Sequence, residues 1–190
     1  MNLKPNDKIL HLLSGGLDSV AMLHEMVSSK LDVQCVLYDY KQRHKQELAF
    51  AIQHCKQLNV SWHTIELPPL GGLTEQSWVV PNRNAIFISI AVNIACSKNR
   101  NVITIGCNKD DSQHFPDCSV HFISSMNHAI AEAGYRQIVL APYLDLTKHQ
   151  IASKAQLFKI EKHTIWTCYA GGEKPCGKCL ACQKLNMSGL

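Results

Sequence analysis

The sequence predicts an α/β protein with a doubly wound, mainly parallel sheet of five strands. Short apolar runs alternate along the chain with segments whose apolar residues recur at helical spacing. Strands that alternate with helices build a parallel sheet that is covered on both faces. A cluster of four cysteines near the C-terminus predicts a small appended segment after the sheet domain.

Three of the expected strands lie in the first half of the chain, at residues 8–13, 33–38 and 62–67. A glycine pair follows the first of them and leads into a helical pattern through Val20, Leu23 and Val27. Residues 46–58 repeat apolar side chains at helical spacing between the second and third strands. Residues 68–81 are rich in glycine and proline, which favours a loop.

The second half adds strands at 102–105 and 138–141 and helices at 120–133 and 147–158. Residues 85–96 are apolar almost all round, so we expect a helix buried in the core. Four segments that carry reactive side chains follow predicted strands, at 14–19, 39–44, 106–117 and 142–148. The third of these is expected to be a polar loop. Because ligands bind beyond the carboxyl ends of parallel strands, the four segments should meet at one edge of the sheet.

Length and composition exclude several classes of protein. The chain has 190 residues and a net charge of +4, and no stretch approaches the ~20 apolar residues of a membrane span. The positive charge is spread along the chain, so it suits an anionic ligand and gives no reason to expect direct nucleic-acid binding. Residues 1–7 are polar, unlike a signal peptide. We therefore expect a cytoplasmic protein with a main domain at 1–160 and a C-terminal segment at 161–190.

The most informative motif is Ser-Gly-Gly-Leu-Asp-Ser at residues 14–19, between the first strand and the first helix. Glycines let the backbone approach an anion, and the following helix offers free N–H groups and the positive end of its dipole. The motif is neither the Walker sequence nor the GxGxxG fingerprint. A glycine-rich turn in which Asp18 or Ser19 caps the helix is the alternative. The complete motif resembles the PP-loop of ATP pyrophosphatases, which holds pyrophosphate, and this implies an ATP site.

The expected ATP site comprises Leu13, Ser14, Gly15, Gly16, Leu17, Asp18, Ser19, Val20 and Asp39. Asp18 is the carboxylate that we expect beside a Mg²⁺ ion bridging the phosphates. Magnesium takes one or two carboxylates and keeps its other positions for water and phosphate. Asp39 ends the second strand, where a carboxylate can contact a ribose. A loop-capping role for Asp39 is equally open.

Further motifs extend the resemblance over nearly the whole chain. They include Tyr-Asp-Tyr-Lys-Gln-Arg-His at 38–44, Pro-Asn-Arg-Asn-Ala at 81–85 and the segments 106–118, 142–148 and 166–182. Together with the loop at 14–19, they resemble the 7-cyano-7-deazaguanine synthase family of the queuosine pathway. Several separate motifs in the right order are far more specific than any one of them.

The resemblance implies an ATP-dependent ligase with a PP-loop, HUP-like fold. Members of this family convert 7-carboxy-7-deazaguanine and ammonia to the nitrile through an adenylate and then an amide, with release of AMP and pyrophosphate. The implied partners are ATP with Mg²⁺, ammonia and a small carboxylate, and the implied assembly is a homodimer. A carboxylate resists nucleophiles because its leaving group would be oxide. Transfer to AMP supplies a good leaving group, so much of the catalysis should be positioning.

Two cations stand at the starts of predicted helices. Arg83 and Asn84 begin one helix, and Lys148 lies in the first turn of another, after a capping box. A cation there opposes the helix dipole unless an anion binds, so we expect Arg83 and Lys148 to be catalytic together with Asp18. A helix start that faces solvent is the alternative. The expected substrate contacts are Arg43, His44, Asn84, Asp111 and Asp117. Loop capping is the alternative for the two aspartates.

The four clustered cysteines are Cys168, Cys176, Cys179 and Cys182, with the spacing C-x₇-C-x₂-C-x₂-C. Four thiolates suit a closed tetrahedral Zn²⁺ site with a structural role and Zn–S distances of about 2.3 Å. One local cluster within a core-forming domain favours a metal in a reducing compartment over a disulfide framework. Free thiols and an iron–sulfur cluster are the alternatives.

The chain departs from the family pattern at Lys41, Asn82, Ser119, Leu180 and Leu185, and its central loop, which contains His114, reads Asp-Ser-Gln-His-Phe at 111–115, where the family has Asp-Tyr-Ser-Gly-Tyr. The first two stand where the family usually has glycine, and Ser119 and Leu185 where it usually has arginine. Serine cannot replace a bidentate carboxylate partner, so a different carboxylate acceptor, or a reaction that stops at the amide, stays open. A PP-loop tRNA sulfurtransferase, with Cys107 or Cys118 available for sulfur transfer, is an alternative from another class. A non-catalytic nucleotide-binding module is a third.

Overall fold

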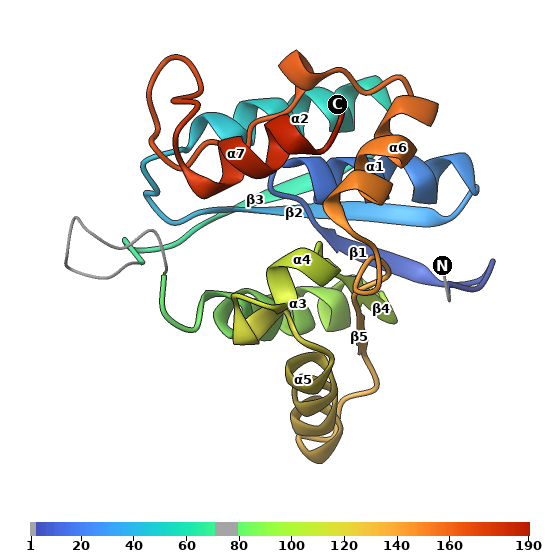
Figure 1. Ribbon diagram of the computed structural model, residues 1–190. Coiled ribbons are helices and arrows are strands. Elements are labelled where there is room, and N and C mark those ends of the chain that lie inside the picture. The colour runs from blue at the N-terminus through green and yellow to red at the C-terminus, as the bar shows by residue number, and fades with distance from the viewer. Residues whose placement is uncertain (1–2, 71–79) are drawn as a thin grey trace.

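The computed structural model describes residues 3–70 and 80–190 and contains a five-stranded sheet (Figure 1). Its strands are β1 (Lys8–Leu12), β2 (Asp32–Asp39), β3 (Trp62–Glu66), β4 (Val102–Thr104) and β5 (Ile138–Leu140). All four neighbouring pairs are parallel, and the order is β3-β2-β1-β4-β5. The predicted fold class is therefore confirmed. The strand order reverses at β1, between β2 and β4, which is where such sheets bind ligands.

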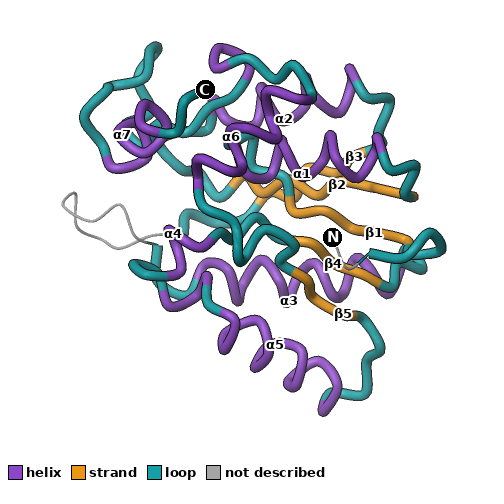
Figure 2. Tube along the Cα trace, turned by 45° about the vertical axis from the view of Figure 1, so that its right-hand side comes forward, coloured by secondary structure: helices purple, strands orange, loops and turns teal. Residues whose placement is uncertain are grey.

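Helices cover both faces of the sheet (Figures 1 and 2). One face carries α1 (Leu17–Ser28), α2 (Gln46–Gln57), α6 (Lys148–Leu157) and α7 (Leu180–Met187). The other carries α3 (Arg83–Ser97) and α5 (Val120–Glu132). Alternate residues of the central strands point to opposite faces of the sheet and pack in two separate cores. Ile9 and Leu37 are buried in the core beneath α1, whereas Leu10 and Val36 are buried in the core above α3.

The helix predicted at 85–96 is less buried than its sequence suggested. Its buried residues in the structure are Asn84, Ile88, Ala91, Val92 and Ala95. Ser89 and Asn93 are exposed on the opposite side. The expectation of a helix enclosed in the core is therefore wrong. The helix is an outer layer whose inner face packs on β1 and β4.

Short helices fall within segments that were expected to be irregular. They are α4 (Lys109–Ser112), η1 (Pro116–Cys118), η2 (Lys162–Thr164) and α7. The side chain of Asn108 caps α4 by accepting a hydrogen bond from the Asp111 N–H at 2.9 Å. One or two turns are too short to display a hydrophobic period, so the sequence pattern did not reveal them. Residues 71–79 of the loop predicted at 68–81 lie outside the described residues.

The C-terminal segment packs back onto the sheet domain. The Trp166 N–H donates to the Gly15 carbonyl at 2.9 Å, and Leu185 is buried in the core beneath α1. Gln46 on α2 donates through its side-chain amide to the carbonyls of Gly171 and Gly172. The division into 1–160 and 161–190 remains an interpretation of the sequence. Within the described ranges, no helix has the length and apolar character needed to cross a bilayer.

Candidate active site

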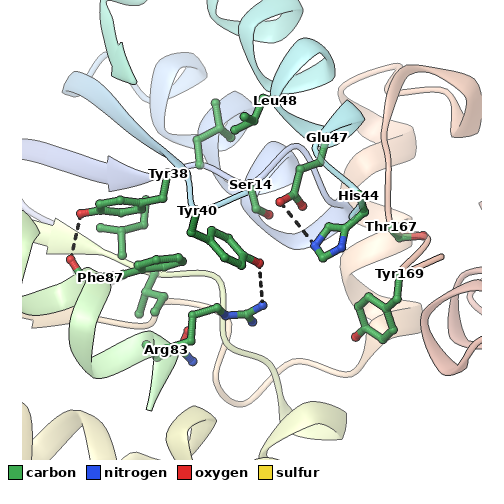
Figure 3. A pocket seen from close by; sticks show the side chains of 14 residues that line it. Ser14, Tyr38, Tyr40, His44, Glu47, Leu48, Arg83, Phe87, Thr167 and Tyr169 are labelled. Atoms are coloured by element: carbon green, nitrogen blue, oxygen red, sulfur yellow. Dashed lines mark hydrogen bonds and ion pairs between the residues drawn. The ribbon is translucent and has the colours of Figure 1, made fainter. Parts of the chain in front are cut away.

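Two adjoining hollows open at the carboxyl edge of the sheet. The first hollow encloses about 720 Å³ and reaches from Ser14, after β1, to Tyr40 and His44, after β2 (Figure 3). The second hollow spans about 730 Å³, open solvent included, and lies over the segment that follows β4. Both are lined by Arg83, Asn84, Ile105 and Tyr169. Three of the four segments that the sequence predicted to meet at this edge line the hollows, and the fourth reaches the edge through Lys148, which contacts Asp18.

The loop at 14–19 has the geometry of an anion-binding turn. Gly15 has a φ of 82°, and a Cβ at this position would lie 2.2 Å from the Glu47 carbonyl oxygen, so only glycine fits. Helix α1 begins at Leu17 after Gly16, and no side chain caps it. Neither Asp18 nor Ser19 is the helix cap, contrary to the alternative considered for this loop. The first N–H groups of α1 point out of the helix end, where they can bind phosphate.

Two buried side chains fix this loop from behind. The Ser19 hydroxyl lies 3.1 Å from the Ser14 hydroxyl and accepts from the Ser14 N–H at 3.2 Å. His11, which is fully buried in β1, donates through Nε2 to the Ser19 carbonyl at 2.9 Å and lies 2.8 Å from the Thr104 hydroxyl. Burial lowers the pKa of His11 to about 4, so the ring stays neutral. The loop is thus tied to both β1 and β4.

An alternating chain of charges extends from the loop to the C-terminal segment. The Lys148 ammonium contacts both carboxylate oxygens of Asp18, at 2.7 and 2.8 Å, and lies 3.7 Å from Asp111. Lys184, on α7, binds the other oxygen of Asp111 at 2.7 Å. The Asn108 amide, which is fully buried, donates to Asp18 at 2.7 Å and also to Asp111. Two of the predicted catalytic residues therefore lie in direct contact.

Neighbouring charges keep both Lys148 and Asp111 ionised. Burial disfavours the Lys148 ammonium, but Asp18 and Asp111 outweigh that effect and raise the pKa of Lys148. Burial likewise disfavours the Asp111 carboxylate, but Lys148 and Lys184 lower the pKa of Asp111. Both groups are therefore charged at neutral pH.

A second polar cluster lines the first hollow (Figure 3). The Glu47 carboxylate accepts from the Gln42 amide at 3.0 Å and lies 3.5 Å from His44 Nε2. Arg83, at the start of α3, donates to the Tyr40 hydroxyl at 3.3 Å. Burial raises the pKa of Glu47 to about 7, against the lowering effects of Gln42 and Arg83. Burial and the charge of Arg83 lower the pKa of His44 to about 4.

Aromatic and aliphatic side chains form the rest of the first hollow. Phe87 stacks on Tyr38, with ring centroids 4.2 Å apart, and the Tyr38 hydroxyl donates to the Phe87 carbonyl at 2.8 Å. Leu12, Leu13 and Leu48 complete this wall. Such a surface suits a planar heterocycle.

Three of the predicted substrate residues line the second hollow, Asn84, Asp111 and Asp117. Asn84, which lines both hollows, donates to the Asp117 carbonyl at 3.1 Å and so fixes the central loop. Cys107 and Cys118 also line it. A hydrogen bond from Cys118 and burial raise the pKa of Cys107 well above its usual value, so Cys107 is a thiol.

Other predicted residues lie away from the hollows. The side chain of Val20 is fully buried in the core, and Arg43 is exposed with its backbone against Gly171. Asp39 is not among the residues that line either hollow; its carboxylate accepts from the Lys41 N–H at 3.0 Å. The roles predicted for Asp39 and Arg43 in ligand binding remain predictions.

Most departures from the family pattern fall outside both hollows, but Phe115, where the family has tyrosine, lines the second hollow. His114, Ser119 and Leu180 are absent from the described residues that line them. Ser119 instead caps α5, because its hydroxyl accepts from the Phe122 N–H at 3.2 Å. Lys41 and Asn82 both have positive φ values, of 60° and 58°, at positions where the family usually has glycine.

The four clustered cysteines form a site that can hold a metal ion such as zinc. The sulfur atoms of Cys168, Cys176, Cys179 and Cys182 all lie within 4.8 Å of one another. A tetrahedral Zn²⁺ site needs sulfur atoms about 3.8 Å apart, so the arrangement fits. The N–H groups of Lys178 and Cys179 donate to the Cys176 sulfur, which lowers the pKa of Cys176 to about 6. Thiolates are the form that binds metal.

Several site residues were missed by sequence reasoning, namely Tyr40, Glu47, Phe87, Thr167, Tyr169 and Lys184. Glu47 follows His44 by three residues at the start of a helix, a spacing that could have indicated it. Lys184 follows the last cysteine of the cluster by two residues. The sequence gives no reason to single out the aromatic residues, because their place in the site depends on residues from other segments that meet them at the sheet edge.

Comparisons with known proteins agree with this geometry. The family described as "Queuosine biosynthesis protein QueC" matches residues 8–188. The 7-cyano-7-deazaguanine synthase of Pseudoalteromonas translucida (strain TAC 125) is 35% identical over 198 residues, which cover 93% of this chain and 91% of that protein. The enzyme of the same name from Agrobacterium fabrum (strain C58 / ATCC 33970) is also 35% identical and covers 92% of this chain and 84% of that protein.

Two solved structures share the fold at lower identity. NMN synthetase from Francisella tularensis has a TM-score of 0.56 and 16% identity, covering 97% of this chain and 84% of that one. The NH3-dependent NAD synthetase from Campylobacter jejuni has a TM-score of 0.53 and 20% identity, covering 86% and 69%. The family match and the curated relatives decide the assignment: the chain belongs to the QueC family of 7-cyano-7-deazaguanine synthases.

Proposed function

We propose that the chain is an ATP-dependent carbon–nitrogen ligase that converts 7-carboxy-7-deazaguanine to 7-cyano-7-deazaguanine with ammonia. The single observation that carries this proposal is the contact between the two hollows. Arg83 and Tyr169 line both, so a reactive group held in one is adjacent to a group held in the other. Membership in the QueC family supplies the substrate class.

The first hollow is the proposed ATP site. Its aromatic and aliphatic wall fits the adenine ring, and Ser14 with the uncapped start of α1 fits the phosphates. Asp18 would hold the Mg²⁺ ion that accompanies ATP, since a carboxylate beside phosphates is the usual protein ligand of magnesium. Mg²⁺ would neutralise charge on the phosphates as pyrophosphate leaves. Lys148, which contacts Asp18, is within reach of the same phosphates.

The second hollow is the proposed acceptor site. Asp111 and Asp117 can accept hydrogen bonds from the N–H groups on the polar edge of a deazaguanine ring. Arg83, at the junction, faces both the acceptor carboxylate and the α-phosphate. A fixed cation there offsets the negative charge that builds up when the two anions meet. Asn84, which lines both hollows, belongs to the same proposal, whereas His44 lines the first hollow alone and would face the nucleotide.

The reaction then needs two activations. The acceptor carboxylate attacks the α-phosphorus of ATP, pyrophosphate leaves, and ammonia displaces AMP from the adenylate to give the amide. The amide oxygen is adenylated in turn, and loss of AMP with the remaining N–H protons gives the nitrile. The residues of the chain hold the reactants in position and offset charge, with no side-chain nucleophile.

We propose zinc as the metal of the four cysteines, in a structural role. Bound zinc would stabilise the segment that carries Thr167 and Tyr169 into the first hollow. None of the nine cysteines in the described structure forms a disulfide, which suits the reducing cytosol, where we place the enzyme. A homodimer is part of the proposal by family resemblance.

The test is incubation with ATP, Mg²⁺, ammonium and 7-carboxy-7-deazaguanine, followed by mass spectrometry. The expected products are the amide, the nitrile, AMP and pyrophosphate. Accumulation of amide alone would show that the reaction stops at the first stage. Pyrophosphate release with another carboxylate but not this one would show a changed acceptor. Iron and labile sulfide in the purified protein would favour the tRNA sulfurtransferase alternative.

A further inference from the structure

Ammonium must lose a proton before it can act as a nucleophile. At neutral pH ammonia is mainly protonated, as simple amines are, and the protonated form has no lone pair. The proposed reaction therefore needs a base near the acyl adenylate, and the inference below rests on that proposed function. In a hollow closed by a nucleotide, this base must be a side chain of the protein.

Glu47 is placed to meet this need. It is the one carboxylate among the described residues that line the first hollow. It stands at the start of α2, against the phosphate loop, since its backbone oxygen packs on Gly15. Its side chain is 13% exposed, and one carboxylate oxygen is held by the Gln42 amide at 3.0 Å. Figure 3 shows the carboxylate directed toward His44 and the interior of the hollow.

The other carboxylates near the site have other roles: Asp117, in the second hollow, is the proposed hydrogen-bond acceptor for the ring edge of the substrate, and the remaining two form ion pairs. Asp18 and Asp111 pair with Lys148, and Asp111 also with Lys184. A carboxylate paired with an ammonium is a weak base, because protonation would break the ion pair.

His44 is the remaining candidate in the first hollow. Burial and the charge of Arg83 lower its pKa to about 4, so it accepts a proton reluctantly. It instead lies beside Glu47, at 3.5 Å, as a neutral neighbour.

We propose that Glu47 is the general base of amide formation, which binds ammonium in the first hollow and takes one proton from it. The groups that face its carboxylate are Gln42 and His44 from the loop after β2, Tyr40 from the same loop, and Arg83 from α3. Arg83 is the one cation in this group; it donates to the Tyr40 hydroxyl at 3.3 Å, and its charge lowers the pKa of Glu47 without outweighing burial.

The proton and electron transfers balance as follows. Ammonium gives one proton to a Glu47 oxygen, and the nitrogen keeps the electron pair of that bond. This pair forms the C–N bond at the acyl carbon, while the bond from that carbon to the AMP oxygen breaks and its pair leaves with AMP. The nitrogen still carries one proton more than the amide, and this proton passes to the departing phosphate. Glu47 returns its proton to water when AMP leaves.

The electrostatics agree with this role. Burial raises the pKa of Glu47 to about 7, against the lowering effects of Gln42 and Arg83. A base with a pKa near the working pH can both accept a proton and release it in each cycle. Because the bound species is ammonium, amide formation should be nearly independent of pH above 7, where free ammonia alone would make it rise, and should fall below pH 7 as Glu47 becomes protonated.

The main test compares two half-reactions in Glu47→Gln. Exchange of radiolabelled pyrophosphate into ATP, with 7-carboxy-7-deazaguanine and no ammonium, reports adenylation alone. Glutamine at position 47 keeps the bond from Gln42, so exchange should stay within about threefold of the parent. Amide formation from ammonium should fall by about 10²–10³-fold, the usual contribution of a general base. Hydroxylamine, a weaker base that is largely unprotonated at neutral pH, should restore most of the rate.

A second variant guards against a folding defect. Glu47→Asp keeps the carboxylate, so its amide formation should retain the pH inflection even if its rate falls. The proposal is overturned if Glu47→Gln loses exchange and amide formation equally, or if hydroxylamine and ammonium suffer the same loss. Either result would mean that Glu47 only supports the loop at 38–44. Absence of exchange in the parent enzyme would instead overturn the proposed function itself.

Discussion

Lys148 places its ammonium against both carboxylate oxygens of Asp18, at 2.7 and 2.8 Å, across 130 residues of chain. The pair joins the start of α6 to the first turn of α1, at the edge where the phosphates of ATP are proposed to bind. A Mg²⁺ ion and a triphosphate arriving together supply one new partner for each member. We therefore expect the Asp18 carboxylate to bind the metal and the Lys148 ammonium to bind the phosphates, so that each keeps a partner of opposite charge.

Asp18→Asn should abolish release of AMP and pyrophosphate while leaving the fold intact. Loss of a carboxylate from a Mg²⁺–phosphate site costs several kcal/mol of transition-state stabilisation, or about 10²–10³-fold or more in rate. The amide oxygen of asparagine can still accept from Asn108, so the local structure should hold. Pyrophosphate release and circular dichroism would check the two parts of this prediction.

Asp32→Asn is the matched control for that change. Asp32 begins β2, at the opposite end of the sheet from the hollows, and pairs with Arg100 while its side chain is 54% exposed. An exposed ion pair contributes little, so stability should change by less than about 1 kcal/mol and activity should be unchanged. Parental turnover in a folded Asp18→Asn protein would refute the metal-binding role.

Cys179→Ser should lose the metal and lower the melting temperature. Serine offers no soft anionic ligand, and a structural metal contributes directly to the free energy of folding. A loss of ~2 kcal/mol or more should lower Tm by at least about 5 °C in a domain of this size. Metal content per chain and thermal unfolding would test this. Cys96→Ser, at an exposed cysteine outside the cluster, should change neither.

Lys184→Met should weaken acceptor binding. Lys184 is 14% exposed and binds an Asp111 oxygen at 2.7 Å, so it sets the carboxylate that lines the second hollow. Loss of a charge-assisted hydrogen bond of ~1.5–3 kcal/mol should raise KM for the acceptor about tenfold or more. Lys184→Arg should recover most of this effect. An equal rise in KM for ATP would indicate a general disturbance of the site.

Two buried histidines should make the fold sensitive to acid. His24 Nε2 lies 3.0 Å from His54 Nδ1, and His54 Nε2 donates to the Thr164 carbonyl at 2.9 Å. Burial lowers the pKa of both rings, so both are neutral at pH 7; since the carbonyl only accepts, His54 Nδ1 then accepts from His24. Burial, with help from the charge of His54, lowers the pKa of His24 to about 4.

A histidine with a lowered pKa costs stability as the unfolded chain becomes protonated. The free energy of unfolding should therefore fall between about pH 6.5 and pH 4, by up to ~1 kcal/mol per pH unit for each ring, and level off below. His24→Gln keeps the donor without the titration, so its slope should be smaller in urea unfolding. His128→Gln, on the exposed side of α5, should leave the slope unchanged.

The sheet and its order of elements could be predicted from the sequence because each strand is a short apolar run between helical periods. The exposure of α3 could not be predicted. Ile86, Ile90 and Ile94 make it apolar all round, yet they are only partly buried, since the helix covers the sheet from outside. Periodicity reports which residues are apolar, whereas the layer in which a helix lies depends on tertiary packing.

The phosphate loop and the four cysteines were predictable because their chemistry depends on local spacing. The chain of charges was not, since it joins residues from α1, the loop after β4, α6 and α7. Leu185 illustrates the difference: it stands where the family usually has arginine, and it is buried in the core. The ammonium of its neighbour, Lys184, binds the Asp111 carboxylate instead. Such a pairing becomes visible only when α7 has been placed.

Ser119→Arg tests whether the departures from the family pattern change the substrate. In the structure, Ser119 lines neither hollow and caps α5 by accepting from the Phe122 N–H. Arginine should therefore remove a helix cap, which lowers the free energy of unfolding by about 1 kcal/mol, without improving turnover of 7-carboxy-7-deazaguanine. Ser119→Asp, which retains a capping oxygen, should keep parental stability. A clear gain in kcat/KM on Ser119→Arg would show instead that this position reaches the acceptor and that the serine has altered its specificity.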